Sequence, residues 1–439
     1  MSAASQVPYR AKHVGVCPSA RGAVIAALVR ARPAPVWIVV AEHARLAGQL
    51  AEDIPFFLET HAPSSSSSPS SAARVLLFPE SMPETGDMRE AFAASADRLT
   101  VLSALRNPHS LLVLTTPAAL LQPVPALAPF AAAEFTLARG QSQSFQGLLE
   151  KLRALDYDSE AVCEAPGHYA IRGGIIDVYP VTATQPYRLD FFGDEIEDIR
   201  AFDPVTQRSG ESVAAITLSA TPRVRLAPSK TGLADYLPPR AANLLLVEPA
   251  TLDAAFSRLA RETSAASATS SAAGAGAAAA GATLAGLLPR FAALLGMSDL
   301  DEAAALFDTP GTHEITWETE SLAHHRSYPA DALIANERLQ AEEDARARFL
   351  AQAAAWSRDG YDLAIVTLNE GEETRAREIL AADPALKTLR PRYLRGTLNE
   401  GFRLTNHGSP RAPNPNPQSQ NPTNTRASRG PSGELGFAG

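Results

Sequence analysis

The segments "HYAIRGGIIDVYP" (168–180) and "YRLDFFGDE" (187–195) are apolar runs interrupted by arginine and acidic residues. Between about 155 and 220, predicted strands follow one another, and the last of them are "EIEDIRAF" (195–202) and "AAITLSATP" (214–222). Gly193-Asp194 suits the tight turn of a β-hairpin. The two opening segments contain no nucleophile, metal cluster or phosphate loop. They predict a mainly β domain with a role other than catalysis.

Outside this region, predicted strands alternate with predicted helices. The apolar runs of buried-strand type are "PVWIVVAE" (35–42), "LLVLTT" (111–116), "LLLVEP" (244–249) and "YDLAIVTL" (361–368). Helical patterns follow at 43–54 and 370–382, and Pro117 suits the first turn of a third helix. Such alternation is typical of parallel sheets that helices cover on both faces. We therefore expect an α/β fold: a parallel-sheet domain, a mainly β insert and a further small α/β domain.

Composition shifts along the chain indicate where these domains begin and end. We expect residues 14–140 and 223–325 to form the parallel-sheet domain, 141–222 the insert, and 326–404 the small α/β domain. Residues 1–13 are expected to be a flexible N-terminus. The low-complexity stretches 63–74 and 263–283 are expected to be surface loops, since long loops cost little extra closure entropy. Residues 405–439 are rich in Pro and Asn and predict a disordered tail.

The overall composition excludes several classes of protein. The formal charge of −9 argues against a general nucleic-acid binder, which usually presents a basic face. No apolar run is long enough for a membrane span, and the N-terminus lacks a signal-peptide core, so a cytoplasmic protein is expected. The two cysteines, Cys17 and Cys163, are too few for a disulfide framework or a structural zinc site and are expected to be buried thiols.

The stretch "GVCPSARGAVIAAL" (15–28) stands where a phosphate-binding loop would be expected. Such a loop needs Gly, Gly-Lys and Ser/Thr for backbone approach, phosphate binding and magnesium binding. This chain has Gly15, then Ala20, Arg21 and Gly22 at those places. We expect a helix capped by Ser19 instead, with no bound nucleotide or other cofactor and no hydrolysis. On a later strand, Glu248 stands where a magnesium-binding aspartate would be expected. The sequence predicts neither a catalytic nor a metal site.

The strand "YRLDFF" (187–192) has two contrasting faces. Tyr187, Leu189 and Phe191 share one face, which is typical of a core. Arg188, Asp190 and Phe192 share the other face. An aromatic residue beside opposite charges is typical of a protein interface. The alternative is that Phe192 caps a second small core while Arg188 and Asp190 form cross-strand ion pairs.

The stretch "EAPGHYAIRGGIIDVYPVTATQPYRLDFFGDEIEDIRAFDPVTQRS" (164–209) resembles the UvrB-like N-terminal region of the transcription-repair coupling factor (Mfd) family. The resemblance extends over roughly residues 14–404. It includes "PSARGAVIAAL" (18–28) at the family's degenerate phosphate loop, "LLFPESMPETGDMREAFAASADRL" (76–99), and "YLRGTLNEGFRL" (393–404). It implies a UvrB-like fold with a degenerate phosphate loop.

In that family the β insert recruits UvrA, the damage-recognition ATPase of nucleotide-excision repair. Carried over motif by motif, the resemblance implies that Arg172, Arg188, Phe192 and Asp194 contact UvrA. The analysis of the strand faces groups Arg188 with Phe192 and places Asp194 at the adjoining turn. Arg172 depends on the resemblance alone. The expected function is a monomeric, non-catalytic adaptor that recruits UvrA to damage-stalled transcription sites.

Full-length relatives are ATP-dependent DNA translocases that also bind RNA polymerase and double-stranded DNA. None of those segments is found here, which suggests an interrupted or truncated reading frame and a UvrA-binding face that is permanently open. The alternative is UvrB itself, a damage-verification ATPase with an aromatic-rich hairpin. The corresponding residues here, 78–99, contain only Phe78 and Phe92 as aromatic residues, which disfavours that alternative.

Overall fold

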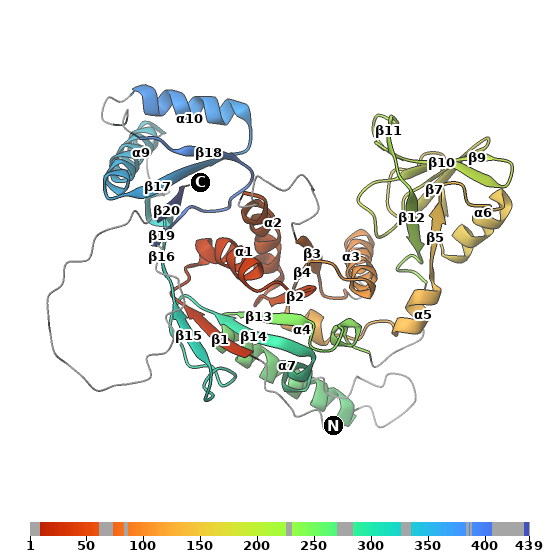
Figure 1. Cartoon of the computed structure of the whole chain (residues 1–439), viewed down its shortest axis with the longest axis horizontal. Coiled ribbons are helices and arrows are strands. Elements are labelled where there is room, and N and C mark those ends of the chain that lie inside the picture. Colours follow the sequence, from red (N-terminus) through yellow and green to blue (C-terminus); the bar gives the residue numbers. More distant parts are fainter. Residues whose placement is uncertain are drawn as a thin grey trace. The chain divides into compact units, whose positions relative to one another are not determined.

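The computed structural model describes residues 9–60, 73–82, 87–224, 231–269, 284–325, 335–382, 386, 389–405 and 434–438 (Figure 1). The chain divides into two compact units. Unit 1 comprises Met1–Val75, Asn243–Ala254 and Ala292–Gly439, and unit 2 comprises Leu76–Ala242 and Ala255–Phe291.

Unit 1 contains strands in the sheet order β15-β1-β14-β13-β2, of which all but β15 are mostly buried. The strands are β15 (His313–Thr316), β1 (Tyr9–Val14), β14 (Phe291–Met297), β13 (Ala242–Val247) and β2 (Val36–Val40). Every residue of β2 and β13 is buried, as the apolar runs predicted. The helices are α1 (Arg21–Ala31), α2 (Ala44–Thr60) and the start of α7 (Pro249–Thr269), and α1 packs against α2. The predicted α/β class is confirmed.

Strand β1 corrects the expected flexible N-terminus over residues 9–13; residues 1–8 lie outside the described part. The strand pairs in parallel with β14 and β15, so that Tyr9 aligns with Ala293, and Ala11 with His313. The charged residues of this segment gave no strand signal in the sequence, yet Ala11, Lys12, His13 and Val14 are all buried. The Lys12 ammonium forms an ion pair with Asp301, so its burial does not leave the charge without a partner.

The small α/β domain of unit 1 has a sheet in the order β16-β19-β20-β17-β18. The strands are β16 (Glu318–Ser321), β19 (Phe402–Thr405), β20 (Glu434–Ala438), β17 (Tyr361–Thr367) and β18 (Arg392–Arg395), with helices α9 (Ala335–Arg358) and α10 (Glu370–Ala382). Strand β17 and helix α10 confirm two predicted elements. Strand β20 differs from the expected disordered tail, because its backbone pairs with both β17 and β19. Residues 406–433 and 439 lie outside the described part.

Unit 2 begins with β3 (Arg74–Phe78), which lies next to β4 (Leu111–Thr115) in the sheet order, and α3 (Met88–Arg106). The Thr116 hydroxyl accepts a hydrogen bond from the Ala119 amide at 3.2 Å, and Pro117 occupies the first turn of α4 (Pro117–Leu121) as predicted. Further helices are α5 (Leu127–Ala132) and α8 (Leu284–Leu287). Helix α7 continues through Thr269, so the low-complexity stretch expected to be a loop from residue 263 begins as a helix. Residues 270–283 lie outside the described part.

The mainly β region of unit 2 confirms the predicted insert. Its sheet has the order β11-β10-β9-β8-β7-β6, with a separate pair of β5 and β12. The strands are β5 (Glu134–Ala138), β6 (Asp158–Ser159), β7 (His168–Arg172), β8 (Ile175–Val178), β9 (Tyr187–Phe192), β10 (Glu195–Phe202), β11 (Ser209–Ser212) and β12 (Ala215–Ser219). Helix α6 (Phe145–Ala154) lies beside this sheet (Figure 1) and adds Leu148, Leu149 and Leu152 to the core.

Two further observations concern the cysteines and the helices of the described residues. Both cysteines are buried and free, and burial raises the pKa of the Cys163 thiol to about 12. No helix in the described ranges is both long and apolar enough to cross a bilayer.

His13 of β1 makes the stability of unit 1 depend on pH. Its Nδ1 accepts a hydrogen bond from Trp317 Nε1 at 3.0 Å, and burial, followed by the Arg32 charge, lowers the pKa of His13 to about 4. Because the unfolded chain binds this proton near pH 6.5 and the folded chain does not, the free energy of unfolding falls between pH 6.5 and 4. Between pH 7 and pH 5 this loss is about 2 kcal/mol.

We expect His13→Gln, which cannot take up that proton, to show a loss of stability between pH 7 and pH 5 that is smaller by about 2 kcal/mol. Urea unfolding followed by tryptophan fluorescence measures it, because all three tryptophans (Trp37, Trp317 and Trp356) lie in unit 1. Equal pH dependence in both proteins would contradict the role of His13.

Candidate protein-interaction site

Strand β9 has the two faces that the alternation predicts. Leu189 is fully buried in the core of the insert, and Tyr187 and Phe191 pack against the same core. Phe191 meets Phe145 of α6 edge-on, with ring centroids 5.2 Å apart. This face holds the strand in the insert and leaves Arg188, Asp190 and Phe192 on the other face.

A buried carboxylate organises the other face. Asp177 of β8 has no exposed surface and lies opposite Arg188 in the strand register. Arg188 Nε and Nη2 donate to the two carboxylate oxygens of Asp177 at 2.7 and 2.8 Å. The hydrogen bonds to Asp177 raise the pKa of Arg188, and its guanidinium also stacks over Phe202 at 4.8 Å. Arg188 is therefore a largely buried residue whose side chain is 14% exposed.

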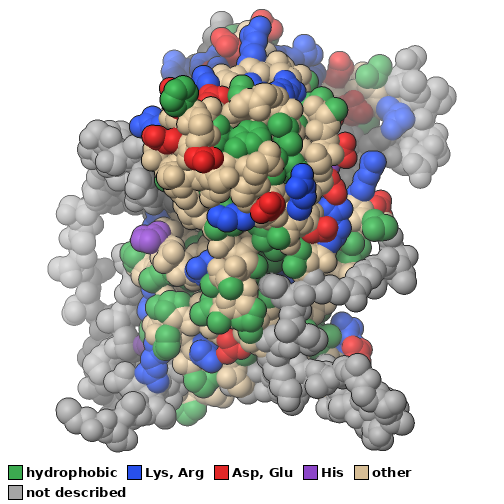
Figure 2. All heavy atoms as spheres, turned by 90° about the vertical axis from the view of Figure 1, so that its right-hand side faces the viewer, with side chains coloured by type: hydrophobic (Ala, Val, Ile, Leu, Met, Phe, Trp, Pro, Cys, Tyr) green, Lys and Arg blue, Asp and Glu red, His purple; other side chains and the backbone are tan. Residues whose placement is uncertain are grey.

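The cross-strand ion pairs that the sequence left open are present. Asp190 of β9 pairs with Arg200 of β10, and Arg200 also lies 3.3 Å from Asp198. Opposite charges therefore bridge β9 and β10 as well as β8 and β9. The space-filling view of Figure 2 shows Lys/Arg and Asp/Glu side chains intermixed on the visible surface of the molecule.

Arg172 of β7 lies at the exposed margin of this face. Its Nε is 3.7 Å from Asp177 Oδ2, and its Nη2 donates to Gln207 Oε1 at 3.2 Å. The register aligns Arg172 with Ile175, and Ile175 with Asp190, the residue between Arg188 and Phe192 on this face. The structure therefore brings Arg172, which rested on the resemblance alone, onto the same face as Arg188 and Phe192.

Phe192 does not cap a second core, because its side chain is 80% exposed. It ends β9 directly before the predicted two-residue turn, where Gly193 has a φ of +60°. Asp194, in that turn, is exposed, and its backbone carbonyl accepts a hydrogen bond from the Gln143 amide at 2.8 Å. Within the described residues its carboxylate forms no ion pair. Phe192 and Asp194 therefore stand together at the tip of a hairpin.

Sequence reasoning missed the residues that support this face. Asp177 was part of the quoted stretch, but it lies between the core residues Ile176 and Val178 in an apolar run. A single acidic residue inside a buried strand indicates a buried ion pair, and this pattern could have predicted the role of Asp177. Arg200 and the short strand β11 carried no comparable signal.

The phosphate-loop position in unit 1 is closed by its own contacts. The amides of Gly15 and Val16 donate to the carbonyls of Asp299 and Ser298 at 3.2 and 3.0 Å. The Cys17 amide donates to Thr319 Oγ1 at 2.7 Å. Gly15 has a φ of +75°, and a Cβ there would lie 2.1 Å from the Trp317 carbonyl oxygen. These backbone amides are occupied by the protein and do not form a cradle for phosphate.

The two residues at the degenerate nucleotide-binding positions pair with each other. Arg21 Nη2 forms an ion pair with Glu248 Oε1, and the same oxygen accepts a hydrogen bond from the Asp299 amide at 3.3 Å. Burial raises the pKa of Glu248, although the Arg21 charge opposes this shift. Gly22 lies at the start of α1, where a Cβ would be 3.0 Å from Asp53 Cβ.

The predicted Ser19 cap is wrong. Residues Pro18–Ala20 form a turn of 3-10 helix, and α1 begins after Ala20 with no side-chain cap. The Ser19 hydroxyl lies 3.5 Å from the Cys17 sulfur instead. Because the first helical turn follows directly from another turn, the serine is one residue too early to cap α1.

The aromatic residues of the 78–99 stretch serve the core of unit 2. Phe78 is fully buried beneath Arg98, whose guanidinium lies 4.2 Å from the ring centroid. Phe92 lies on α3 and packs against the core of the insert, close to Gly167. Residues 83–86 lie outside the described part. Neither ring forms an exposed aromatic wedge of the kind implied for UvrB.

In the part of the chain that the structure describes, no group of three His, Cys, Asp or Glu residues has the arrangement of a metal site.

Removing the Arg21 charge should destabilise unit 1. Arg21→Ala removes the cation that pairs with the partly buried Glu248 carboxylate. Because that charge then lacks this partner, we expect the free energy of unfolding to fall by about 2–3 kcal/mol. Arg21→Ala combined with Glu248→Gln should cost less than the sum of the two single changes, since the residues are coupled. Urea unfolding followed by tryptophan fluorescence measures both. A loss no larger than that of the exposed-residue control Arg45→Ala would contradict the buried pair.

Comparison with known proteins shows what the insert is similar to. Residues 135–222 match the family model described as "UvrB interaction domain". The chain is 26% identical to the transcription-repair-coupling factor of Bacillus subtilis (strain 168) over 217 residues, which is 49% of this chain and 17% of that protein. It is 34% identical to the transcription-repair-coupling factor of Myxococcus xanthus over 215 residues, 48% of this chain and 17% of that protein.

A third relative matches over a shorter stretch. The transcription-repair-coupling factor of Escherichia coli (strain K12) is 41% identical over 80 residues, which is 18% of this chain and 7% of that protein. The matches thus span less than a fifth of the length of these relatives. Residues 135–222 are thus similar to the UvrB interaction domain family, and about half of the chain is similar to transcription-repair coupling factors.

Proposed function

We propose that this chain acts in transcription-repair coupling as a non-catalytic adaptor that binds UvrA. The observation that carries the proposal is Phe192, a large apolar side chain that is 80% exposed at the tip of the β9–β10 hairpin. Single exposed apolar residues are common, but this one lies in the domain that matches the UvrB interaction family. It also belongs to the set that the resemblance carries over as UvrA contacts: Arg172, Arg188, Phe192 and Asp194.

We assign different roles to these four residues. Phe192 and Asp194 are exposed and have the freedom to contact a partner. Arg188 donates to Asp177 through Nε and Nη2 and to Ser209 Oγ through Nη1, so it acts mainly as the support beneath them. Arg172 is more exposed than Arg188 and lies farther from Asp177, so it retains donors for a partner. Phe192 is therefore the energetic centre of the proposed interface, since aromatic anchors dominate such interfaces.

The closed phosphate loop supports an adaptor without catalysis. A nucleotide would have to displace the Asp299 and Ser298 carbonyls from the loop amides and separate Arg21 from Glu248. The UvrB-type alternative, a damage-verifying ATPase, needs both a working loop and an aromatic wedge, and no observation favours it. RNA polymerase and double-stranded DNA remain expectations for full-length relatives. A monomer is expected for this chain.

Phe192→Ala tests the interface. We expect it to weaken UvrA binding by at least about 2 kcal/mol, roughly 30-fold in Kd, without lowering the free energy of unfolding, because the ring makes little contact with its own domain. Isothermal titration calorimetry with purified UvrA, without ATP or DNA, measures the affinity. Met88→Ala, an equally exposed apolar change in unit 2, is the matched control and should bind like wild type. Unchanged affinity in Phe192→Ala, or no binding by wild type, would contradict the proposal.

Nucleotide addition tests the absence of catalysis. We expect millimolar Mg-ATP neither to raise the thermal unfolding midpoint nor to be hydrolysed, because the loop amides and Arg21 are already engaged. Differential scanning fluorimetry and a phosphate-release assay measure the two effects. Turnover above the buffer rate, or a midpoint shift that depends on ATP concentration, would refute the non-catalytic assignment.

A further inference from the structure

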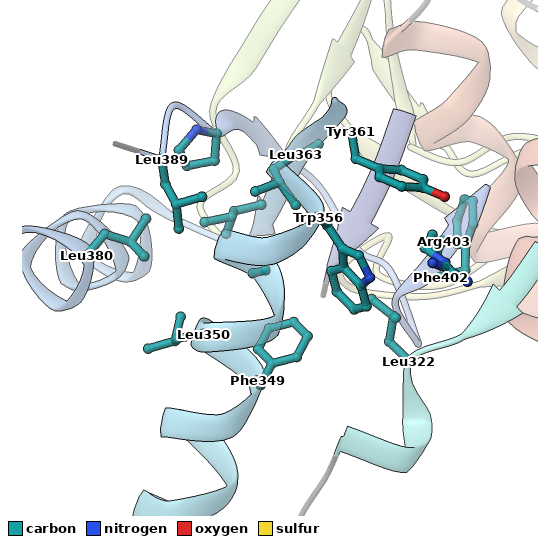
Figure 3. A pocket seen from close by; sticks show the side chains of 14 residues that line it. Leu322, Phe349, Leu350, Trp356, Tyr361, Leu363, Leu380, Leu389, Phe402 and Arg403 are labelled. Carbon is teal, nitrogen blue, oxygen red and sulfur yellow. The ribbon is translucent and has the colours of Figure 1, made fainter. Parts of the chain in front are cut away.

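The apolar cavity of the small α/β domain is too small to hold a ring-sized ligand. Figure 3 shows Trp356 of α9, Leu363 of β17 and Leu380 of α10 among the side chains that line it. Its volume is about 50 Å³, whereas an apolar cavity of about 150 Å³ is known to bind benzene. The apolar groups available to a partner are therefore those on the surface.

The two most exposed large apolar side chains among the described residues both lie in the insert. Val205 is 89% exposed and Phe192 is 80% exposed. Phe192 precedes β10, and Val205 follows it in the turn formed by residues 203–208, here called the β10–β11 turn. Single exposed apolar residues are common on protein surfaces, but here one strand has such a residue at each of its ends.

The β10–β11 turn lies against the candidate interaction site. Arg172 Nη2 donates to Gln207 Oε1 of the turn at 3.2 Å. Arg188 Nη1 donates at 3.3 Å to the hydroxyl of Ser209, the first residue after the turn. Because both arginines belong to the candidate site, these contacts place Val205 at the margin of the same surface.

Hydrogen bonds within the β10–β11 turn fix the position of Val205. Asp203 Oδ1 accepts hydrogen bonds from the amides of Val205 and Thr206 at 2.7 and 3.0 Å. The Asp203 carbonyl accepts from the Gln207 amide at 2.8 Å, and Gln207 Nε2 donates to the Pro204 carbonyl at 2.6 Å. Valine also has few side-chain conformations, because it is branched at Cβ. Ordering this residue on binding therefore costs little conformational entropy.

The surface between the two ends of β10 is polar. It contains a hollow of about 610 Å³ whose lining residues are all charged or polar: Arg139, Asp190, Glu197, Asp198, Arg200 and Ser212. Solvent-exposed ion pairs contribute only about 0–1 kcal/mol each. The apolar side chains at the two ends are therefore the groups from which a partner gains most.

The length of β10 suits a single partner. The strand has eight residues, which at about 3.3 Å per residue span about 26 Å. A standard protein interface buries about 800 Å² on each partner, a patch roughly 30 Å across. One partner surface can therefore cover both ends of the strand.

We propose that Val205 is a second apolar contact of the UvrA interface, at the opposite end of β10 from Phe192. This inference rests on the proposed function, because it names a further residue of the same site. UvrA meets the insert through two separate apolar contacts, one at each end of β10, with polar groups facing the hollow between them. Valine has less apolar surface than phenylalanine, so Val205 contributes less than Phe192.

Substitutions of Val205 test the proposal by isothermal titration calorimetry with purified UvrA. We expect Val205→Asp to raise the Kd at least about ten-fold, because a charge without a partner is costly to bury. Val205→Ala, which removes the contact without adding a charge, should raise the Kd about three-fold, and Val205→Ile should bind within about two-fold of wild type. The thermal unfolding midpoint should not change, because the side chain is exposed. Met88→Asp places the same charge at another exposed apolar residue of unit 2 and should bind like wild type.

The outcomes distinguish this proposal from UvrA binding itself. If Phe192→Ala weakens binding but Val205→Asp and Val205→Ala bind like wild type, the second contact is overturned and UvrA binding stands. An equal loss of affinity in Met88→Asp and Val205→Asp would also overturn the second contact, because added charge alone would explain the loss. No binding of UvrA by wild type would overturn both proposals.

Discussion

The burial of Asp177 is the constraint on which the candidate interaction face depends. A carboxylate with no exposed surface is tolerated only with a cation and well-placed hydrogen bonds, and Arg188 supplies both from the neighbouring strand. A slip of one residue would separate Arg188 from Asp177 and would also turn Leu189 out of the core. The ion pair and the core therefore both oppose a change of register. The ion pair between Asp190 and Arg200 joins the next strand in the same way. Phe192 is consequently presented at the end of a strand whose register is held on both sides.

The same principle closes the phosphate-loop position in unit 1. Arg21 and Glu248 stand where a nucleotide site would need a lysine and a magnesium-binding acid, and here each serves as the partner of the other. The loop amides hydrogen-bond to carbonyls of the segment after β14. At this position the residues of α1, the end of β13 and the segment after β14 contact one another.

Two of the wrong expectations share one cause. Residues 9–13 and 434–438 were assigned to flexible ends because their short segments are polar or lie next to Pro/Asn-rich sequence, yet both form strands. A five- or six-residue strand has a weak local signal, and its stability comes from neighbours far away in the chain. For β1 those neighbours are β14 and β15, and for β20 they are β17 and β19. The Ser19 cap failed for a smaller reason, a turn of 3-10 helix that moves the start of α1 by one residue.

Local pattern determined much of this protein. Apolar runs defined β2, β4, β13 and β17, strict alternation separated the two faces of β9, and Gly193-Asp194 set the hairpin that carries Phe192. The residue types at Gly15, Arg21 and Gly22 were enough to show a departure from the phosphate-binding loop pattern. These features depend on periodicity and side-chain chemistry within a few residues, which a sequence displays directly. Tertiary structure alone decided which charges meet, that Phe192 is exposed while Phe191 is packed, and that β20 enters the middle of a sheet. Ion pairs and strand order join residues that are distant along the chain, and their separation in space is set only when the chain folds.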